Sequence, residues 1–186
     1  MTVPADALPA AGREKTAALR RCARTALARS ASFSGVLLGP LDKGDRGQPL
    51  PSRGIHWSLS HTSGVVAAVT APFPVGIDVE RIAPFSMALK KRLAGPSEWA
   101  LASPLDETLF CRFWTAKEAV LKAAGAGLSG LPRCSVVEVV DERVLRLIFD
   151  SVAWTVSHCS MAASHLAAIT AAPRRVVWHL LELERQ

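Results

Sequence analysis

Residues 57–63 read WSLSHTS, and residues 154–160 repeat the pattern as WTVSHCS, 97 residues further on. The segment AAVTA at residues 67–71 returns in the same way as AAITA at residues 167–171. Each copy alternates polar and apolar residues, breaks at a short polar turn and resumes as an apolar run, which is typical of a β-hairpin. The repeat therefore predicts two related halves in one chain.

Helical segments separate the expected strands. Runs without Gly or Pro and with helical spacing of apolar residues predict helices over residues 13–29, 85–93, 97–103 and 106–124. Alternating apolar runs predict strands over residues 57–60, 65–71, 75–80, 135–140, 144–149, 153–158 and 165–171. Residues 176–183 fit either a strand or a helix. The fold class is α/β (α+β).

The composition excludes several classes of protein. With 186 residues, 49% of them hydrophobic and 20% charged, the chain is large enough to bury a core. Its apolar runs are far shorter than the roughly 20 residues that span a bilayer. The N-terminus lacks a basic start followed by a long apolar block, so we expect a cytoplasmic protein. Four widely spaced cysteines indicate neither a zinc site nor a disulfide framework.

Positive charge is concentrated in the first half of the chain. The net charge is +6, of which residues 1–74 carry +5 and residues 75–186 carry +1. A basic nucleic-acid-binding module is one interpretation of this excess. The chain has no tyrosine, no zinc-finger spacing and no basic residues interleaved with stacking aromatics, so we expect no nucleic-acid partner.

The segment GIDVE, residues 76–80, contains two acidic residues that are two positions apart. In an extended segment Asp78 and Glu80 point to the same side, while Ile77 and Val79 point to the core. Two like charges on one face are unfavourable without a positive partner, and carboxylate oxygens suit a hard cation such as Mg²⁺. A solvated edge strand is the alternative that the motif leaves open.

A second chemical pattern lies in FWTAKEAVLKA, residues 113–123, within the strongest helical segment. Trp114, Glu118 and Lys122 are four residues apart and share one stripe of that helix. An exposed Glu–Lys pair worth about 0.3–0.5 kcal/mol is the simpler interpretation of an isolated helix.

Polar turns offer two candidate anion sites. The turn WSLSHTSG at residues 57–64 carries hydroxyls, an imidazole and backbone N–H groups that can hold a phosphate. A Ser–His nucleophile pair is disfavoured, because the adjacent residues Ser60 and His61 project to opposite sides of an extended chain. The loop LDKGDRGQPLP at residues 41–51 is either an exposed loop without a ligand or an anion-binding site formed by Lys43 and Arg46.

Taken in order, the basic helix, the KGDRGQP loop and the WSLSHT, GIDVE and WTAKEAVLKA motifs resemble the Sfp-like 4′-phosphopantetheinyl transferases. The resemblance implies a pseudo-dimer of two similar α/β halves, with the active site between residues 1–74, which bind the nucleotide, and residues 75–186, which hold the metal. It implies transfer of the phosphopantetheine arm of coenzyme A to a serine of an apo acyl, peptidyl or aryl carrier protein, with release of adenosine 3′,5′-bisphosphate. A relative that binds coenzyme A without transferring its arm is the alternative.

The resemblance also assigns roles to residues. It makes Asp78, Glu80 and Glu118 the ligands of Mg²⁺, with Mn²⁺ as a possible substitute. Glu118 and Lys122 become the catalytic residues: Glu118, a metal-bound water or Glu98 accepts the serine proton, and Lys122 neutralises phosphate charge. Residues that the resemblance places against coenzyme A are Arg13, Arg20, Lys43, Arg46, Gly47, Gln48, Ser60, His61, Thr62 and Lys117.

Some features depart from the family or concern partners. Many relatives carry Lys in place of Gln48, and His158, the counterpart of His61, is expected to be structural because no Asp-x-Glu follows it. Carrier proteins are typically acidic, so the charge of +6 would steer the encounter. The two halves already build one interface, and we expect a monomer with no membrane association.

Overall fold

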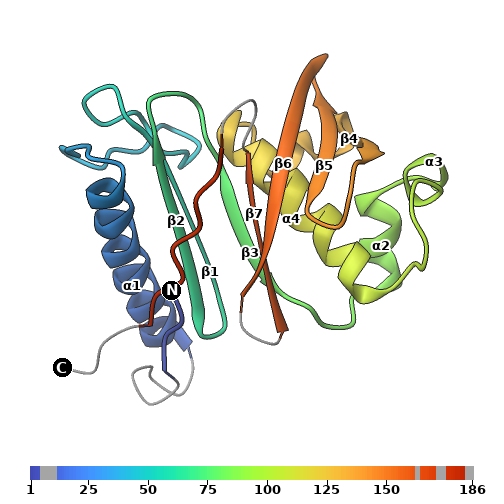
Figure 1. The fold of residues 1–186 in the computed structure, drawn as a ribbon, viewed down its shortest axis with the longest axis horizontal. Coiled ribbons are helices and arrows are strands. Elements are labelled where there is room, and N and C mark those ends of the chain that lie inside the picture. The colour runs from blue at the N-terminus through green and yellow to red at the C-terminus, as the bar shows by residue number, and fades with distance from the viewer. Residues whose placement is uncertain (5–11, 162–163, 171–174, 183–186) are drawn as a thin grey trace.

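Two antiparallel sheets organise the chain (Figure 1). The computed structural model describes residues 1–4, 12–161, 164–170 and 175–182. Strands β1 (His56–Thr62) and β2 (Val65–Ala71) form a hairpin, whose tight turn requires Gly64 at φ 77°. The second sheet has the order β3-β7-β6-β5-β4. Its strands are β3 (Ile77–Arg81), β4 (Cys134–Val139), β5 (Val144–Phe149), β6 (Val152–Met161) and β7 (His165–Thr170).

Helices cover both sheets. The long helix α1 (Gly12–Phe33) packs on the hairpin through a stripe of small and aliphatic residues that includes Leu19, Ala23 and Leu27. The remaining helices are α2 (Met87–Leu93), α3 (Pro96–Trp99), α4 (Glu107–Ala123) and the 3-10 helix η2 (Leu128–Arg133). The chain is therefore a mixed α/β protein with antiparallel sheets, as the sequence predicts.

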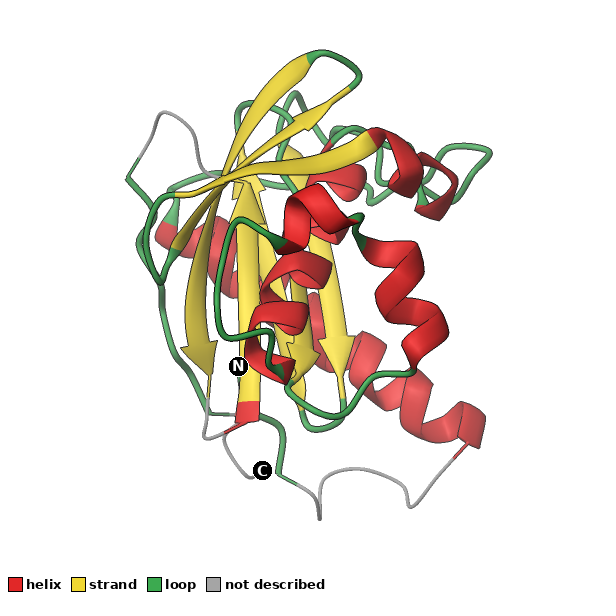
Figure 2. Ribbon diagram, turned by 90° about the vertical axis from the view of Figure 1, so that its right-hand side faces the viewer, coloured by secondary structure: helices red, strands yellow, loops and turns green. Residues whose placement is uncertain are grey.

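Helix α4 is the centre of the larger core. It begins at Asp106, whose carboxylate caps the helix by accepting from the backbone N–H of Leu109 at 2.8 Å. The helix packs against β3 and β7 on one face of the sheet (Figure 2). Phe110 and Phe113 are almost completely buried, and burying each such ring stabilises the fold by about 1.5–3 kcal/mol. This packing fixes α4 relative to β3.

Most observed elements match those expected from the sequence, with differences at their ends, whereas the 3-10 helix η2 was not expected. The helix expected over residues 97–103 is only the single turn α3, which ends at Trp99 and is followed by turns and bends up to residue 104. Strand β6 runs three residues beyond the predicted end. Ala171 and Leu183, at the ends of two predicted segments, lie outside the described residues.

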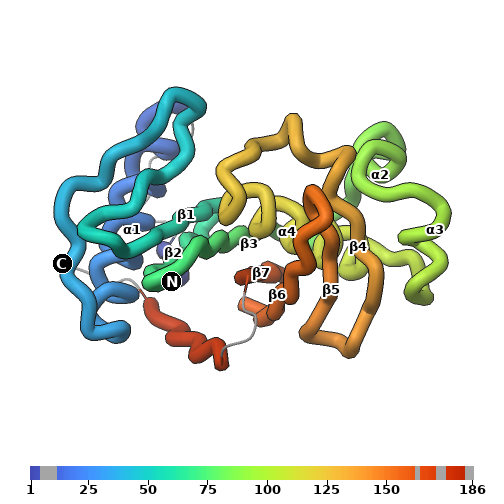
Figure 3. The backbone as a smooth tube through the Cα atoms, turned by 90° about the horizontal axis from the view of Figure 1, so that it is seen from above, coloured from blue at the N-terminus to red at the C-terminus, as the bar shows by residue number. Residues whose placement is uncertain are grey.

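Residues 175–182 form neither a helix nor a regular strand, although either was expected from residue 176 on. They run back toward the first half of the chain, red in Figure 3. The backbone N–H of Thr2 donates to the carbonyl of Leu181 at 2.9 Å, and the ring of His179 stacks on Phe33 with centroids 3.9 Å apart. The segment therefore packs partly on the half to which it does not belong by sequence.

Within the part of the chain that the structure describes, no helix combines the length and the apolar character needed to cross a membrane.

Candidate active site

Strand β3 presents two acids toward the hairpin and α4. Ile77 and Val79 are buried in the core between the two sheets. Asp78 is only 4% exposed and Glu80 is half-buried. Both carboxylates lie on the same side of β3, because side chains alternate along a strand. The hydrogen-bond partners of both come from β1 and α4.

A glycine allows α4 to approach β3 closely. A Cβ atom at Gly76 would lie 1.9 Å from the carbonyl oxygen of Ala119 and 2.7 Å from the backbone nitrogen of Ala123. Both atoms belong to the helix backbone, which has no rotamer with which to move aside. The last two turns of α4, which carry Glu118 and Lys122, therefore stand directly against the start of β3.

Lys122 joins three elements. Its ammonium donates to Asp78 Oδ1 at 2.7 Å and to the carbonyl of Ile77 at 3.1 Å, both in β3. It also lies 3.5 Å from the carbonyl of Leu59 in β1. The side chain is 28% exposed and lines the cavity that lies between α1, β1 and the end of α4.

The acids perturb one another. Burial raises the pKa of Glu118 to about 7, and the negative charges of Asp78 and Glu80 add to this rise while Lys122 opposes it. Burial, and then Asp78, also raise the pKa of Glu80. Three carboxylates thus share one ammonium, and the site favours an additional positive charge.

Two oxygens of this cluster lack a hydrogen-bond partner. Asp78 Oδ2 and Glu118 Oε1 are buried, and no donor among the described residues reaches them, an arrangement that is costly for a carboxylate unless a cation fills it. The described residues contain no preassembled group of three metal-ligating side chains. The oxygen donors themselves fit a hard cation such as Mg²⁺, and enclosing one requires the carboxylates to draw together.

A cavity of about 420 Å³ opens beside the acids, between α1, the loop before β1, β1 itself and the end of α4. Its charged and titratable lining residues are all basic or imidazole, namely Arg20, Arg24, Lys43, Arg46, His61 and Lys122. Burial lowers the pKa of His61, and the charges of Arg20 and Lys122 lower it further. A neutral imidazole among five cations marks the cavity as an anion site.

The loop over this cavity is held by its own glutamine. Gly44 N–H donates to the carbonyl of Gln48 at 2.9 Å, and the Gln48 side chain accepts from Arg46 N–H at 3.1 Å. A Cβ atom at Gly44 would lie 2.2 Å from the Gln48 amide nitrogen, and the stem of Gln48 reaches the space beside Gly125 at the end of α4. These contacts hold Lys43 and Arg46 in the cavity wall.

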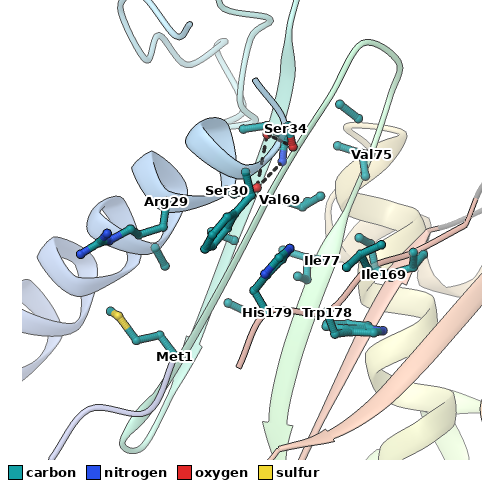
Figure 4. A pocket seen from close by; sticks show the side chains of 18 of the residues that line it. Met1, Arg29, Ser30, Ser34, Val69, Val75, Ile77, Ile169, Trp178 and His179 are labelled. Atoms are coloured by element: carbon teal, nitrogen blue, oxygen red, sulfur yellow. Dashed lines mark hydrogen bonds between the residues drawn. The ribbon is translucent and has the colours of Figure 1, made fainter. Parts of the chain in front are cut away.

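A second cavity, of about 360 Å³, is different in character (Figure 4). It lies between α1, β2, the β3–β7 edge and residues 175–181. Aliphatic and aromatic side chains such as Val69, Ile77 and Trp178 dominate its wall, which also carries two arginines, Arg29 and Arg175. Five lysines and arginines line the first cavity, so the first cavity is the better candidate for an anion site.

The profile that describes the 4′-phosphopantetheinyl transferase superfamily matches residues 74–170, just over half of the chain. The chain belongs to this superfamily. The matched range includes β3 and α4, and so contains all three candidate acids and Lys122. Helix α1, the loop at residues 41–51 and β1 lie outside it.

Individual relatives agree with the profile. A 4′-phosphopantetheinyl transferase of Bacillus subtilis is 31% identical over 113 residues, which are 57% of this chain and 50% of the relative. HetI of Nostoc sp. PCC 7120, another 4′-phosphopantetheinyl transferase, is 34% identical over 107 residues, 51% of this chain and 45% of the relative. The transferase psf-1 of Bacillus pumilus is 36% identical over 78 residues, 40% of this chain and 34% of the relative. The chain thus matches a third to a half of each relative's length.

Most residues that the family resemblance assigned to coenzyme A gather at the first cavity. Those that line it are Arg20, Lys43, Arg46, Gly47, Gln48 and His61. Ser60 and Thr62 instead bond to the acids of β3. Arg13 is exposed near the start of α1 and is not among the lining residues. Lys117 is 1% exposed and pairs with Glu98 at 2.7 Å, also away from the cavity lining.

Sequence reasoning did not single out Arg24, Ser58 or Gly125, all of which line the cavity. Arg24 follows Arg20 by one helical turn, so helical spacing was the signal that could have identified it. No comparable local pattern marks Gly125, which reaches the cavity only because α4 ends there.

Proposed function

We propose that this protein transfers the 4′-phosphopantetheine arm of coenzyme A to a serine hydroxyl of an apo carrier protein. The observation that carries the proposal is the placement of Lys122, which lines a cation-rich cavity and bonds to a buried acid of β3 in a chain of this superfamily. Coenzyme A has the matching chemistry, with a pyrophosphate to bridge the two regions and a 3′-phosphate for the arginines and lysines.

In the proposed reaction the serine oxygen attacks the phosphorus that carries the pantetheine arm. The bond from that phosphorus to the bridging oxygen breaks, and adenosine 3′,5′-bisphosphate leaves. Lys122 neutralises charge on the phosphate oxygens. Asp78, Glu80 and Glu118 would hold Mg²⁺, or Mn²⁺ in its place. When bound, such a cation supplies charge neutralisation at the pyrophosphate.

Glu118 is the group that we assign to accept the serine proton. Burial raises the pKa of its carboxyl to about 7 in the cation-free protein, and a bound cation would lower it. The assignment therefore depends on the place of Glu118 in the acid cluster, where its Oε1 has no donor among the described residues. Glu98 is the less suitable base, because both of its carboxylate oxygens are engaged: Oε1 contacts Lys117 and accepts from Val136 N–H, and Oε2 accepts from Gly95 N–H.

A pseudo-dimer of two halves, 1–74 and 75–186, belongs to the proposal. Its support is that both copies of the repeat are antiparallel hairpins, β1–β2 and β6–β7, and that the polar cavity lies between elements of the two halves. The second half includes residues 175–182, which pack partly against the first. A monomeric, cytoplasmic protein acting on an acidic carrier completes the proposal, with the charge of +6 steering the encounter.

Mass spectrometry tests the proposal directly. The protein is incubated with coenzyme A, Mg²⁺ and several apo carrier proteins from fatty-acid, polyketide and nonribosomal-peptide systems. At least one carrier should gain the mass of one phosphopantetheine arm, and its serine-to-alanine variant should gain nothing. Binding of coenzyme A without modification of any carrier would instead favour a relative that binds the cofactor but does not transfer its arm.

A further inference from the structure

Strand β1 places a row of hydroxyls against β3. Ser58 accepts from the backbone N–H of Ile77 at 3.2 Å. Ser60 donates to Asp78 Oδ1 at 2.8 Å, and the side chain of Thr62 hydrogen-bonds to Glu80. The three residues occupy every second position of β1. Their hydroxyls therefore lie on the same side of the strand.

The two oxygens of Asp78 have different surroundings. Oδ1 accepts from both Ser60 and Lys122, at 2.8 and 2.7 Å. Oδ2 is buried and has no donor among the described residues. Turning the carboxylate out of this orientation would break two hydrogen bonds, one of them charged, so the two donors fix the orientation of the group and leave its second oxygen free of donors.

Glu80 is held in a comparable way from two elements. Thr62 in β1 and Trp114 in α4 both hydrogen-bond to its carboxylate, and both bonds lower its pKa against the effect of burial. Of the two serines in β1, Ser60 therefore bonds to an acid and stays out of the lining of the neighbouring anion site.

We propose that Ser60 is a positioning residue for the divalent cation: it fixes Asp78 through Oδ1 so that Oδ2 stays available as a ligand. This inference rests on the proposed function, and it replaces the role of Ser60 as a phosphate contact. Its hydroxyl hydrogen is already donated to Asp78, its residue is 8% exposed, and it is absent from the cavity lining.

Thr170 in β7 supplies a matched control outside the cation-lined cavity. It is 5% exposed, and its hydroxyl accepts at 2.9 Å from the backbone N–H of Gly76, directly before β3, so its partner is a backbone N–H and not a carboxylate. Thr170→Val and Ser60→Ala each remove one buried hydrogen bond to the segment that contains β3. Only the second removes a donor to a candidate metal ligand.

The experiment measures Mn²⁺ affinity by the electron paramagnetic resonance signal of the free ion, with coenzyme A saturating and coenzyme A alone as blank. Loss of groups that orient metal ligands typically weakens metal binding about 10–100-fold. Ser60→Ala should weaken Mn²⁺ binding by at least about tenfold, Thr170→Val should leave it nearly unchanged, and Ser60→Thr, which keeps the hydroxyl, should restore it. Coenzyme A affinity in EDTA, measured by calorimetry, should be the same for Ser60→Ala and wild type.

The outcomes separate the two proposals. If wild type binds Mn²⁺ and Ser60→Ala binds it equally well, the role of Ser60 is refuted while the transferase proposal stands. Weaker coenzyme A binding in EDTA with unchanged Mn²⁺ affinity would make Ser60 a phosphate contact after all. Absence of Mn²⁺ binding to the wild-type complex would overturn the cation site itself and with it the proposed chemistry.

Discussion

Lys117 and Glu98 form a buried ion pair, with the ammonium nitrogen 2.7 Å from Oε1 and side chains that are 1% and 13% exposed. The same ammonium donates to the carbonyl of Leu93 at the end of α2, and the same carboxylate accepts from β4 through Val136 N–H. The pair therefore ties α4 to α2, α3 and β4. A lysine that stands next to Glu118 in sequence thus stabilises the helix that carries Glu118.

Removing one charge of this pair should destabilise the fold more than removing both charges. Lys117→Met leaves a largely buried carboxylate without its counter-charge, and we expect a loss of about 3–5 kcal/mol in the free energy of unfolding. Adding Glu98→Gln to Lys117→Met should recover much of that loss. Urea denaturation of both variants checks this, and equal losses in the two would contradict the ion-pair interpretation.

Gly76→Ala should separate β3 from α4. The added methyl would overlap the Ala119 carbonyl, whose backbone cannot rotate away, so we expect a loss of about 3 kcal/mol or more. Gly95→Ala is the control, because no atom lies within 4 Å of a Cβ atom there. Thermal or urea unfolding of the two variants measures the difference. A Gly76→Ala protein as stable as the control would show that the two elements can move apart at little cost.

Arg24→Gln should weaken the binding of adenosine 3′,5′-bisphosphate about tenfold, because a charged hydrogen bond contributes about 1.5–3 kcal/mol and 1.4 kcal/mol is a factor of ten. Arg13→Gln removes the same charge from the same helix outside the cavity lining, and should change the affinity little at physiological salt. Calorimetric titration compares them. Equal effects would indicate a general field of the basic helix and no specific contact by Arg24.

His158 should reduce the stability of the protein in acid. Its ring nitrogens lie 3.1 Å from the carbonyls of Arg143 and Arg112, and burial, followed by the charge of Arg112, lowers its pKa from 6.5 to about 4. Because the unfolded state binds the proton more tightly, stability is complete above pH 6.5 and falls as the pH decreases toward 4. The shift corresponds to about 3 kcal/mol.

Unfolding free energies of wild type and His158→Gln between pH 7 and 4 measure this contribution. The variant should lose less stability over that interval than wild type does. Parallel curves would mean that the two carbonyl partners keep the imidazole protonated in the folded protein.

Glu118→Gln should abolish transfer and weaken Mn²⁺ binding while leaving adenosine 3′,5′-bisphosphate affinity in EDTA close to that of wild type, because the cavity lining does not include this residue. Transfer assays and calorimetry on the same preparation test both parts. Full transfer activity in the variant would rule out Glu118 as both base and metal ligand.

The local pattern of the sequence determined the secondary structure and the direction of several side chains. Helical and strand periodicities follow from backbone geometry within a few residues, so α4, the two hairpins and the shared side of Asp78 and Glu80 were all predictable. The exceptions lie where local signals compete or are weak, as in the single turn of α3 and the irregular residues 175–182.

Only the tertiary structure decided which hydrogen-bond or ion-pair partner each motif residue has. Ser60 meets Asp78, Lys117 meets Glu98, and Arg24 joins the cavity because elements that are distant in sequence come together there. A side chain's type limits the bonds it can make, whereas the atoms available to it are set by packing between those elements. That packing includes the approach of α4 to Gly76, which no periodicity within either segment encodes.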